Sequence, residues 1–460
     1  MKTIRIISTI LLALTCTAAF SQSTFRKTIN IDDRDIGKYI SQTSDGGYII
    51  TGETYNSLEN IFLAKTDMYG DTLWAKTYES VHQEYAYCVR ETLDEGFIIA
   101  AQTNLGGLKA WIIKTDATGD TLWTRMLEGR IYNILPTADS AYLLAGYETY
   151  DSKAVLRKMD QSGELIWTKS YGFSKIFYEM IELSGDRIMV GGLSRLKEAP
   201  GSTTIELFMT NHSGDSLWVK QYGGVYIYYY LSLQNTYDGG YIFSATKMLY
   251  FEDANIYLHK VDSVGNTQWT KVFGEDYISD ISQGVVQTPD SGYMLTGEKY
   301  MLPKKGNSGM FLLKTDQHGD SLWEKSFDTD TTRTSGYGLI KTADDHIVLC
   351  GEELSPYAPA TSNILLLKVD QEGLITNLAE LKTREKITIT PNPNQGNFRV
   401  NILDGDRELM IFDMTGRLII KQNIKPHEGN SLQVTDLNKG SYLIQIKSAK
   451  AYRTAKVLVL

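Results

Sequence analysis

The chain has 460 residues, which allows two or three domains or one large repeat array with an appendage, and its net charge is −9. An acidic chain with scattered lysines is a poor partner for nucleic acid, so the composition argues against that class of ligand. The 29 tyrosines and 39 glycines, against only 9 prolines, favour an all-β chain of strands and tight turns.

The first 21 residues have the pattern of a secretory signal peptide. Lys2 and Arg5 precede an apolar stretch at residues 6–14, and small residues follow up to Ser21, after which we expect cleavage. A lipoprotein signal using Cys16 is the alternative, although Ala-Leu-Thr before it is a poor lipobox. No later segment reaches the ~18 apolar residues of a membrane-spanning helix, so we do not expect the mature chain to cross a membrane.

One unit recurs seven times between residues 25 and 377. Its first landmark is a tight turn before an apolar run, as in Asp45-Gly46-Gly47. Its second landmark is Lys-x-Asp-x-x-Gly-x-x-x-Trp-x-Lys, as in the segment from Lys65 to Lys76. Each unit has room for four short strands, A to D, with the Asp-Gly turn between A and B and the Trp on D. The repeat predicts a seven-bladed β-propeller spanning residues 22–382.

The last repeat predicts how the ring closes. Asn377 stands where its Trp should be, while Phe25-Arg26-Lys27-Thr28 near the chain start matches Trp74-Ala75-Lys76-Thr77. We therefore expect residues 25–30 to form the outer strand of the seventh blade, which would remove an open sheet edge. The recurring Trp suggests a sugar-binding row, but packing between neighbouring blades is the stronger interpretation. The repeats resemble secreted propeller units built on Gly-Gly-Tyr and Asp-x-x-Gly, a resemblance that implies no activity.

Residues 383–460 follow a different pattern, which predicts a small Ig-like β-sandwich. Its motifs, in chain order, are Pro391-Asn392-Pro393, Asp413-x-x-Gly416-Arg417, Leu437-x-x-Gly440-x-Tyr442 and the basic Lys456 near the end. The segment resembles the type A C-terminal sorting domain of the type IX secretion system. That resemblance implies passage through the periplasm of a Gram-negative bacterium, recognition by the outer-membrane translocon, and release or surface anchoring. An ordinary Ig-like adhesive domain is the alternative.

The sequence contains no recognisable catalytic or metal-binding motif. Its six histidines are scattered, and it has neither a Gly-x-Ser-x-Gly elbow nor a Walker loop, so we predict no cofactor, no metal and no catalytic residue. Cys88 and Cys350 are expected to be buried free thiols. A non-catalytic binding or adhesion module for glycan or protein is the favoured function. A carbohydrate-active enzyme with its site at the ring axis remains open, as does a structural role.

The B–C and D–A loops, among them a predicted D–A loop at residues 222–226, should share one face of the ring and vary between copies, which makes that face the predicted binding surface. Tyrosine offers a flat apolar ring and a hydroxyl, which suits glycan or protein partners. Packing between blades is the alternative for any single tyrosine. The predicted binding residues are Tyr55, Tyr150, Tyr226, Tyr228, Tyr250, Tyr277, Tyr300 and Tyr357.

Overall fold

The structure is a computed structural model that divides into two compact units, Met1–Ile375 and Thr376–Leu460. It describes residues 24–375 and 387–460, except 57, 81, 149–152, 173–175, 196–201, 249–253, 275–277, 302–307, 329–331, 356–357, 403–405, 414–417, 425–430 and 449–451. The predicted signal peptide at residues 1–21 lies outside this described part.

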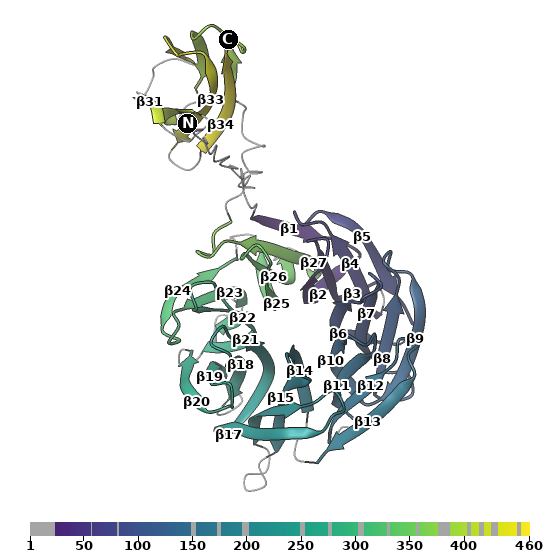
Figure 1. The fold of residues 1–460 in the computed structure, drawn as a ribbon. Coiled ribbons are helices and arrows are strands. Elements are labelled where there is room, and N and C mark those ends of the chain that lie inside the picture. The colour runs from purple at the N-terminus through teal and green to yellow at the C-terminus, as the bar shows by residue number, and fades with distance from the viewer. Residues whose placement is uncertain are drawn as a thin grey trace, which may run out of the picture. The chain divides into compact units, whose positions relative to one another are not determined.

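The described residues of the first unit form seven four-stranded antiparallel blades around a common axis (Figure 1). Blade 1 contains β2 (Arg34–Gln42), β3 (Tyr48–Tyr55), β4 (Glu59–Thr66) and β5 (Thr72–Tyr78). Blade 2 contains β6 (Glu84–Glu91), β7 (Phe97–Thr103), β8 (Lys109–Thr115) and β9 (Thr121–Glu128). Blade 3 contains β10 (Arg130–Pro136), β11 (Tyr142–Tyr147), β12 (Ala154–Met159) and β13 (Leu165–Tyr171).

Blades 4 and 5 share one long strand, β17 (Ser216–Asn235). Its first half pairs with blade 4, which also contains β14 (Ile176–Leu183), β15 (Arg187–Arg195) and β16 (Thr203–Thr210). Its second half pairs with blade 5, which continues with β18 (Tyr241–Met248), β19 (Ala254–Val261) and β20 (Thr267–Phe273). The prediction of a loop at residues 222–226 is therefore wrong. Tyr222 and Tyr226 both pair with β16 across a register shift at the Gly-Gly pair, and the next residue, Ile227, pairs with Met248, so the strand runs from blade 4 directly into blade 5.

The ring closes as the sequence predicts. Blade 6 contains β21 (Ile278–Gln287), β22 (Tyr293–Met301), β23 (Ser308–Thr315) and β24 (Ser321–Ser326). Blade 7 contains β25 (Arg333–Lys341), β26 (Ile347–Ser355), β27 (Ala358–Val369) and, as its outer strand, β1 (Phe25–Ile29). The pairing of β1 with β27 is antiparallel, with Phe25 opposite Lys368 and Ile29 opposite Ile364. The N-terminal strand thus completes the last blade.

In six of the seven blades of the described ring, a lysine of strand C holds the A–B turn, and blade 4 has Met209 at that position. Lys65 Nζ lies 2.8 Å from Asp45 Oδ2, and the same carboxylate accepts hydrogen bonds from Thr43 and from the Gly47 amide. Burial alone would raise the pKa of Asp45, but these bonds lower it to about 2. Gly46 adopts a φ of +84°, which glycine tolerates best. The Lys-x-Asp landmark and the Asp-Gly landmark therefore belong to one structural unit.

The described residues of the second unit form two facing sheets. One has the order β28 (Ile389–Thr390), β29 (Phe398–Asn401), β32 (Ser431–Val434). The other has the order β31 (Leu418–Asn423), β30 (Asp406–Asp413), β33 (Gly440–Ser448), β34 (Tyr452–Val459). Buried side chains of both sheets share one core, which includes Phe398, Leu432, Ile411 and Ile444. The prediction of a small β-sandwich is confirmed. Among the described residues, none belongs to a helix with the length and hydropathy to cross a bilayer.

Candidate functional site

The innermost strand of each blade carries a β-bulge, which places one extra residue in strand A. Bulges are typical of sites where a side chain is redirected, often near functional centres. The bulge lies where the A–B register shifts, and in five blades of the described ring its residue is tyrosine. From blade 1 to blade 7 the bulged residues are Lys38, Tyr87, Tyr132, Tyr178, Tyr230, Gln283 and Tyr337.

All seven bulged residues line a single cavity of about 830 Å³. Strands A stand closest to the ring axis (Figure 1), so we call it the axial cavity. It extends from Glu53 and Tyr85 at one end to Gln234 and Asn235, next to the A–B turn of blade 5. Its volume falls in the range of roughly 300–1,000 Å³ that is usual for small-molecule sites.

Three neighbouring tyrosines form an aromatic wall across blades 2 to 4. The ring centroids of Tyr87 and Tyr132 are 4.9 Å apart with planes at 61°, and those of Tyr132 and Tyr178 are 4.8 Å apart at 45°. Edge-to-face and tilted contacts of this kind are favourable for aromatic pairs. Burial raises the pKa of Tyr132 and of Tyr178 above that of free tyrosine. Their hydroxyls therefore stay protonated at neutral pH and can both donate and accept hydrogen bonds.

Arg130 holds this aromatic wall in place. Its guanidinium carbon lies 5.5 Å from the ring centroids of both Tyr87 and Tyr132, and 5.9 Å from that of Tyr147. Its Nη1 also donates a hydrogen bond of 2.9 Å to the Tyr132 hydroxyl. A cation over aromatic faces contributes about 0.5–2 kcal/mol per contact, depending on exposure. Arg130 thus fixes the orientation of rings contributed by two blades.

The other charges of the wall lie in pairs. Arg90 Nη2 is 3.9 Å from Glu179 Oε1, which also accepts a 3.0 Å hydrogen bond from Asn133. Burial raises the pKa of Glu179 to about 7, although Arg90 opposes this shift. On blade 1, Lys38 Nζ lies 3.7 Å from Glu53 Oε2, where burial raises the pKa to about 7 against the effect of Lys38. In each pair, burial opposes ionisation of the carboxyl group in spite of the neighbouring cation.

Lys38 links the two ends of the ring at the cavity. Its Nζ lies 3.7 Å from the ring centroid of Tyr337 on blade 7. The Tyr337 hydroxyl donates to Glu352 Oε1 at 3.3 Å, and burial raises the pKa of that carboxyl group. A cation, two carboxyl groups and a tyrosine thus meet where blade 1 joins blade 7. In the described part of the chain, no three His, Cys, Asp or Glu side chains are grouped as metal ligands.

The repeated Trp packs between blades. A Cβ added to Gly119 of blade 2 would lie 2.8 Å from the ring of Trp74 in blade 1, and Phe25 occupies the same position over Gly70 at 2.6 Å. The basic residue two positions after the aromatic reaches the same turn of the next blade in all seven seams. These contacts are Lys27–Asp71, Lys76–Asp120, Arg125–Glu164, Lys169–Asp215, Lys220–Asn266, Lys271–Asp320 and Lys325 to the Glu372 carbonyl. The packing interpretation is confirmed, since these rings cover backbone.

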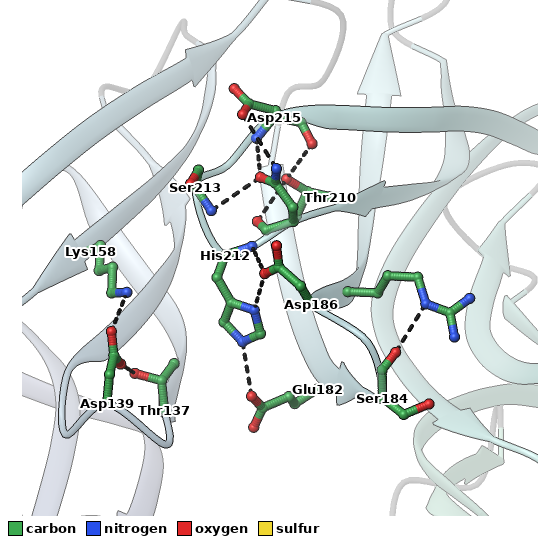
Figure 2. A network of polar contacts seen from close by, with 12 residues as sticks. Thr137, Asp139, Lys158, Glu182, Ser184, Asp186, Thr210, His212, Ser213 and Asp215 are labelled. Carbon is green, nitrogen blue, oxygen red and sulfur yellow. Dashed lines mark hydrogen bonds and ion pairs between the residues drawn. The ribbon is translucent and has the colours of Figure 1, made fainter.

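A histidine also occurs on the face that carries the turns (Figure 2). His212 Nδ1 lies 2.6 Å from Asp186 Oδ1, and its Nε2 lies 2.8 Å from Glu182 Oε1. On the neighbouring blade, hydrogen bonds from Lys158 and Thr137 lower the pKa of Asp139 to about 2. The His212 contacts tie the C–D turn of blade 4 to its A–B turn and strand A. They stabilise the turns, and within this network Glu182 also lines the axial cavity.

The structure describes four of the eight predicted loop tyrosines. Four of them lie in strands: Tyr55 ends β3 with 45% of its surface exposed, Tyr226 and Tyr228 lie in β17, and Tyr300 lies in β22. Tyr150, Tyr250, Tyr277 and Tyr357 lie outside the described residues. The sequence interpretation missed the bulge tyrosines. Their signal is a tyrosine nine or ten residues before the start of strand B, as in Tyr87, Tyr132, Tyr178 and Tyr337.

The cysteines behave as predicted. Cys88 and Cys350 are buried free thiols. They lie on strands of different blades, and burial raises the pKa of each thiol. Both side chains pack in the core and carry no chemistry.

The motif residues of the second unit divide into exposed and structural positions. Pro391, Asn392 and Pro393 are exposed, and Asn392 Oδ1 accepts a 3.0 Å hydrogen bond from the Leu458 amide. Gly440 begins β33, and the buried Tyr442 donates to the Asn438 carbonyl at 2.9 Å. Of the other motif residues, Lys456 lies in β34 and Gly416 lies outside the described residues. The exposed Pro-Asn-Pro segment is thus tied to the last strand.

The comparisons identify the second unit. Residues 388–460 match the family described as "Secretion system C-terminal sorting domain". No curated protein matches the chain significantly. The fold of the first unit is defined by the strand pairing described above.

Several solved structures resemble the chain weakly. The WD40 domain of Pan2 from Neurospora crassa is 10% identical with a TM-score of 0.47, over 72% of this chain and 88% of that chain. A protein of unknown function from Dyadobacter fermentans is 12% identical with a TM-score of 0.47, over 75% and 97%. The β-propeller domain of the Trilobed protease from Pyrococcus furiosus is 12% identical with a TM-score of 0.41, over 72% and 95%.

The sorting domain determines where the protein goes. It interacts with the type IX secretion machinery, which passes its cargo from the periplasm across the outer membrane. Residues 388–460 are therefore a type IX sorting domain, and the chain is a β-propeller protein that Gram-negative Bacteroidetes secrete or attach to their surface.

Proposed function

We propose that the propeller is a non-catalytic binding module that takes up a glycan or a segment of protein in the axial cavity, and so serves in adhesion outside the cell. The observation that carries this proposal is the set of bulged residues, because all seven line one cavity and five of them are tyrosine. Packing alone does not account for tyrosine there, since of the five bulged tyrosines Tyr178 packs against a core between blades and all five line the cavity. Ligand pockets are typically such concave, aromatic-lined spaces.

The loop tyrosines remain a second proposed location for binding. Tyr55 is well exposed near the B–C loop of blade 1, which suits a contact surface. A single experiment separates the two locations. The secreted protein is applied to glycan and protein arrays as wild type, as the double variant Tyr87→Ala/Tyr132→Ala, and as the triple variant Tyr226→Ala/Tyr250→Ala/Tyr300→Ala.

We expect the double variant to lose binding and the triple variant to retain it. Tyr69→Ala is the matched control, because Tyr69 is 51% exposed on a C–D turn remote from the axial cavity. Tryptophan fluorescence and circular dichroism check that each variant is folded. Loss of binding in the triple variant alone would move the site to the loop face. An unchanged signal in both would refute both locations.

A carbohydrate-active enzyme with its site in the same cavity is the second candidate. Glu53 and Glu179 both line the cavity, and burial raises the pKa of each to about 7. A carboxyl group with such a pKa suits general acid catalysis, and glycoside hydrolysis uses a pair of carboxyl groups. Release of reducing sugar from polysaccharides by the wild type, and its loss in Glu53→Gln, would favour this candidate over binding alone.

A further inference from the structure

Two of the three carboxyl groups that line the axial cavity are paired with a cation. Glu53 contacts Lys38 and Glu179 contacts Arg90, while Glu182 lies 2.8 Å from the His212 ring. Arg130, the remaining lining cation, lies against three tyrosine rings. Transfer of a charge into a buried site is costly unless an opposite charge is available to pair with it. A charged ligand group placed at Glu53 or Glu179 would therefore break an existing pair, and a cationic group placed beside Arg130 would meet like charge.

The titration of the cavity acids supports the same conclusion. Burial raises the pKa of both Glu53 and Glu179 to about 7, even though each has a cationic neighbour. The cavity therefore penalises charge on its own side chains. An anionic ligand would face the same penalty, whereas a neutral polar ligand would not.

The hydrogen-bonding groups of the wall match a ligand that carries hydroxyl groups. Neutral amides and a hydroxyl line the cavity at Asn133, Ser232, Gln234 and Gln283, beside the tyrosine hydroxyls. Amide and hydroxyl groups both donate and accept hydrogen bonds, as the hydroxyl groups of a ligand do.

The aromatic wall supplies the apolar part of the recognition. Tyr87, Tyr132 and Tyr178 present a series of rings across three blades, each ring half-buried and fixed by its neighbours. A rigid aromatic ring binds with little loss of conformational entropy, and its face accepts an apolar surface while its hydroxyl remains polar. Sugar rings have this dual character, because C–H groups cover their faces and hydroxyls surround their edges.

We infer that the ligand of the axial cavity is a neutral oligosaccharide, an inference that rests on the binding function proposed above. Residues of blades 2 to 4 contribute the stacking surface, while Ser232, Gln234, Gln283 and the tyrosine hydroxyls contribute hydrogen bonds to hydroxyl groups. The cavity of about 830 Å³ takes a short oligosaccharide or the end of a longer chain.

Titration calorimetry on the full secreted chain tests this inference. The neutral probes are cellohexaose, laminarihexaose, xylohexaose and mannohexaose. The charged probes are hexagalacturonate, the glucosamine hexamer, and one acidic and one basic hexapeptide. We expect at least one neutral probe to bind and every charged probe to bind at least about 10-fold more weakly, which corresponds to about 1.4 kcal/mol.

Three variants locate the binding. Tyr132→Ala should weaken it by about 10-fold or more, as truncation of a central aromatic contact typically does. Tyr132→Phe keeps the ring packing and should weaken binding less, which keeps the test valid if the alanine variant does not fold. Tyr69→Ala should leave affinity unchanged.

Each other outcome overturns a defined claim. Tightest binding of a charged sugar or a peptide that still depends on Tyr132 would overturn the neutral class but leave the proposed binding function intact. Binding of a neutral probe that neither Tyr132 variant affects would overturn the axial site. Failure of every neutral probe to bind would overturn the inference.

Discussion

Replacement of Phe25 by alanine should destabilise the propeller strongly, because this side chain completes the seam between the first and last blades. The Phe25 side chain is only 4% exposed and lies in the core shared by blades 1 and 7. Its ring meets the ring of Tyr48 edge-on, with centroids 6.2 Å apart, and covers Gly70. Truncation of a buried Phe to Ala costs about 3–5 kcal/mol. This is a large share of the ~5–15 kcal/mol that stabilises a typical domain.

Tryptophan fluorescence measures this loss in the propeller alone, since all seven tryptophans lie between residues 74 and 323. At about 2.1 cal/mol/K per residue over roughly 350 residues, a loss of 3–5 kcal/mol corresponds to a fall of about 4–7 °C in Tm. Urea denaturation of the full chain should show the same loss as a lower midpoint with an unchanged slope.

Two further variants separate the ring contact from other effects of β1. Lys27→Ala removes an exposed ion pair with Asp71 and should cost no more than about 1 kcal/mol. Phe25→Trp installs the residue found at the equivalent position of the other six blades, and should fold. If Phe25→Ala melts at the same temperature as Lys27→Ala, β1 does not carry the closure and the reasoning fails.

Gly119→Ala should lower Tm more than Gly106→Ala does. Both glycines have positive φ, but only at Gly119 would the added Cβ meet the ring of Trp74. Equal falls in Tm would show that backbone strain alone accounts for the loss of stability. Glu206→Gln should stabilise the propeller at pH 8 by up to about 3 kcal/mol and have little effect near pH 4.5. Burial raises the folded pKa of Glu206 to about 7, so the stability of the wild type falls as pH rises from about 4.5 through 7; a difference independent of pH in urea titrations would contradict this. Deletion of residues 385–460 should trap the propeller in the periplasm, and its appearance in the culture medium by immunoblot would contradict the export route.

The fold was predictable because the repeats act as an internal alignment. Gly70 and Trp74 recur with fixed spacing, so turns and outer strands could be placed in every blade, and the resemblance of Phe25 to Trp74 was enough to predict the closure. Both motifs depend on local chemistry, namely positive φ at glycine and a large ring over the next turn. Such local requirements restrict the residue type at a position, so they can be recognised in the sequence.

The axial cavity was harder to predict because the sequence pattern does not show where in strand A a bulge lies. An extra residue reverses the alternation of side chains along strand A, so the pattern does not show which face Tyr132 takes. The Gly-Gly pair before Tyr226 reads as a turn, yet hydrogen-bond pairing on both sides keeps β17 continuous. In both places the outcome depends on pairing partners that are distant in the sequence.

The pairing of β1 with β27 has a consequence for the order of events during synthesis and export. The last blade gains its outer strand only after β27, which ends at Val369, has been made, so ring closure joins segments separated by almost the whole propeller. Such non-local pairing is entropically costly and slow to form. Because β27 ends before the sorting domain begins, proteolytic removal of residues 388–460 would leave every blade complete. The propeller can therefore lose its export signal after crossing the outer membrane and remain closed.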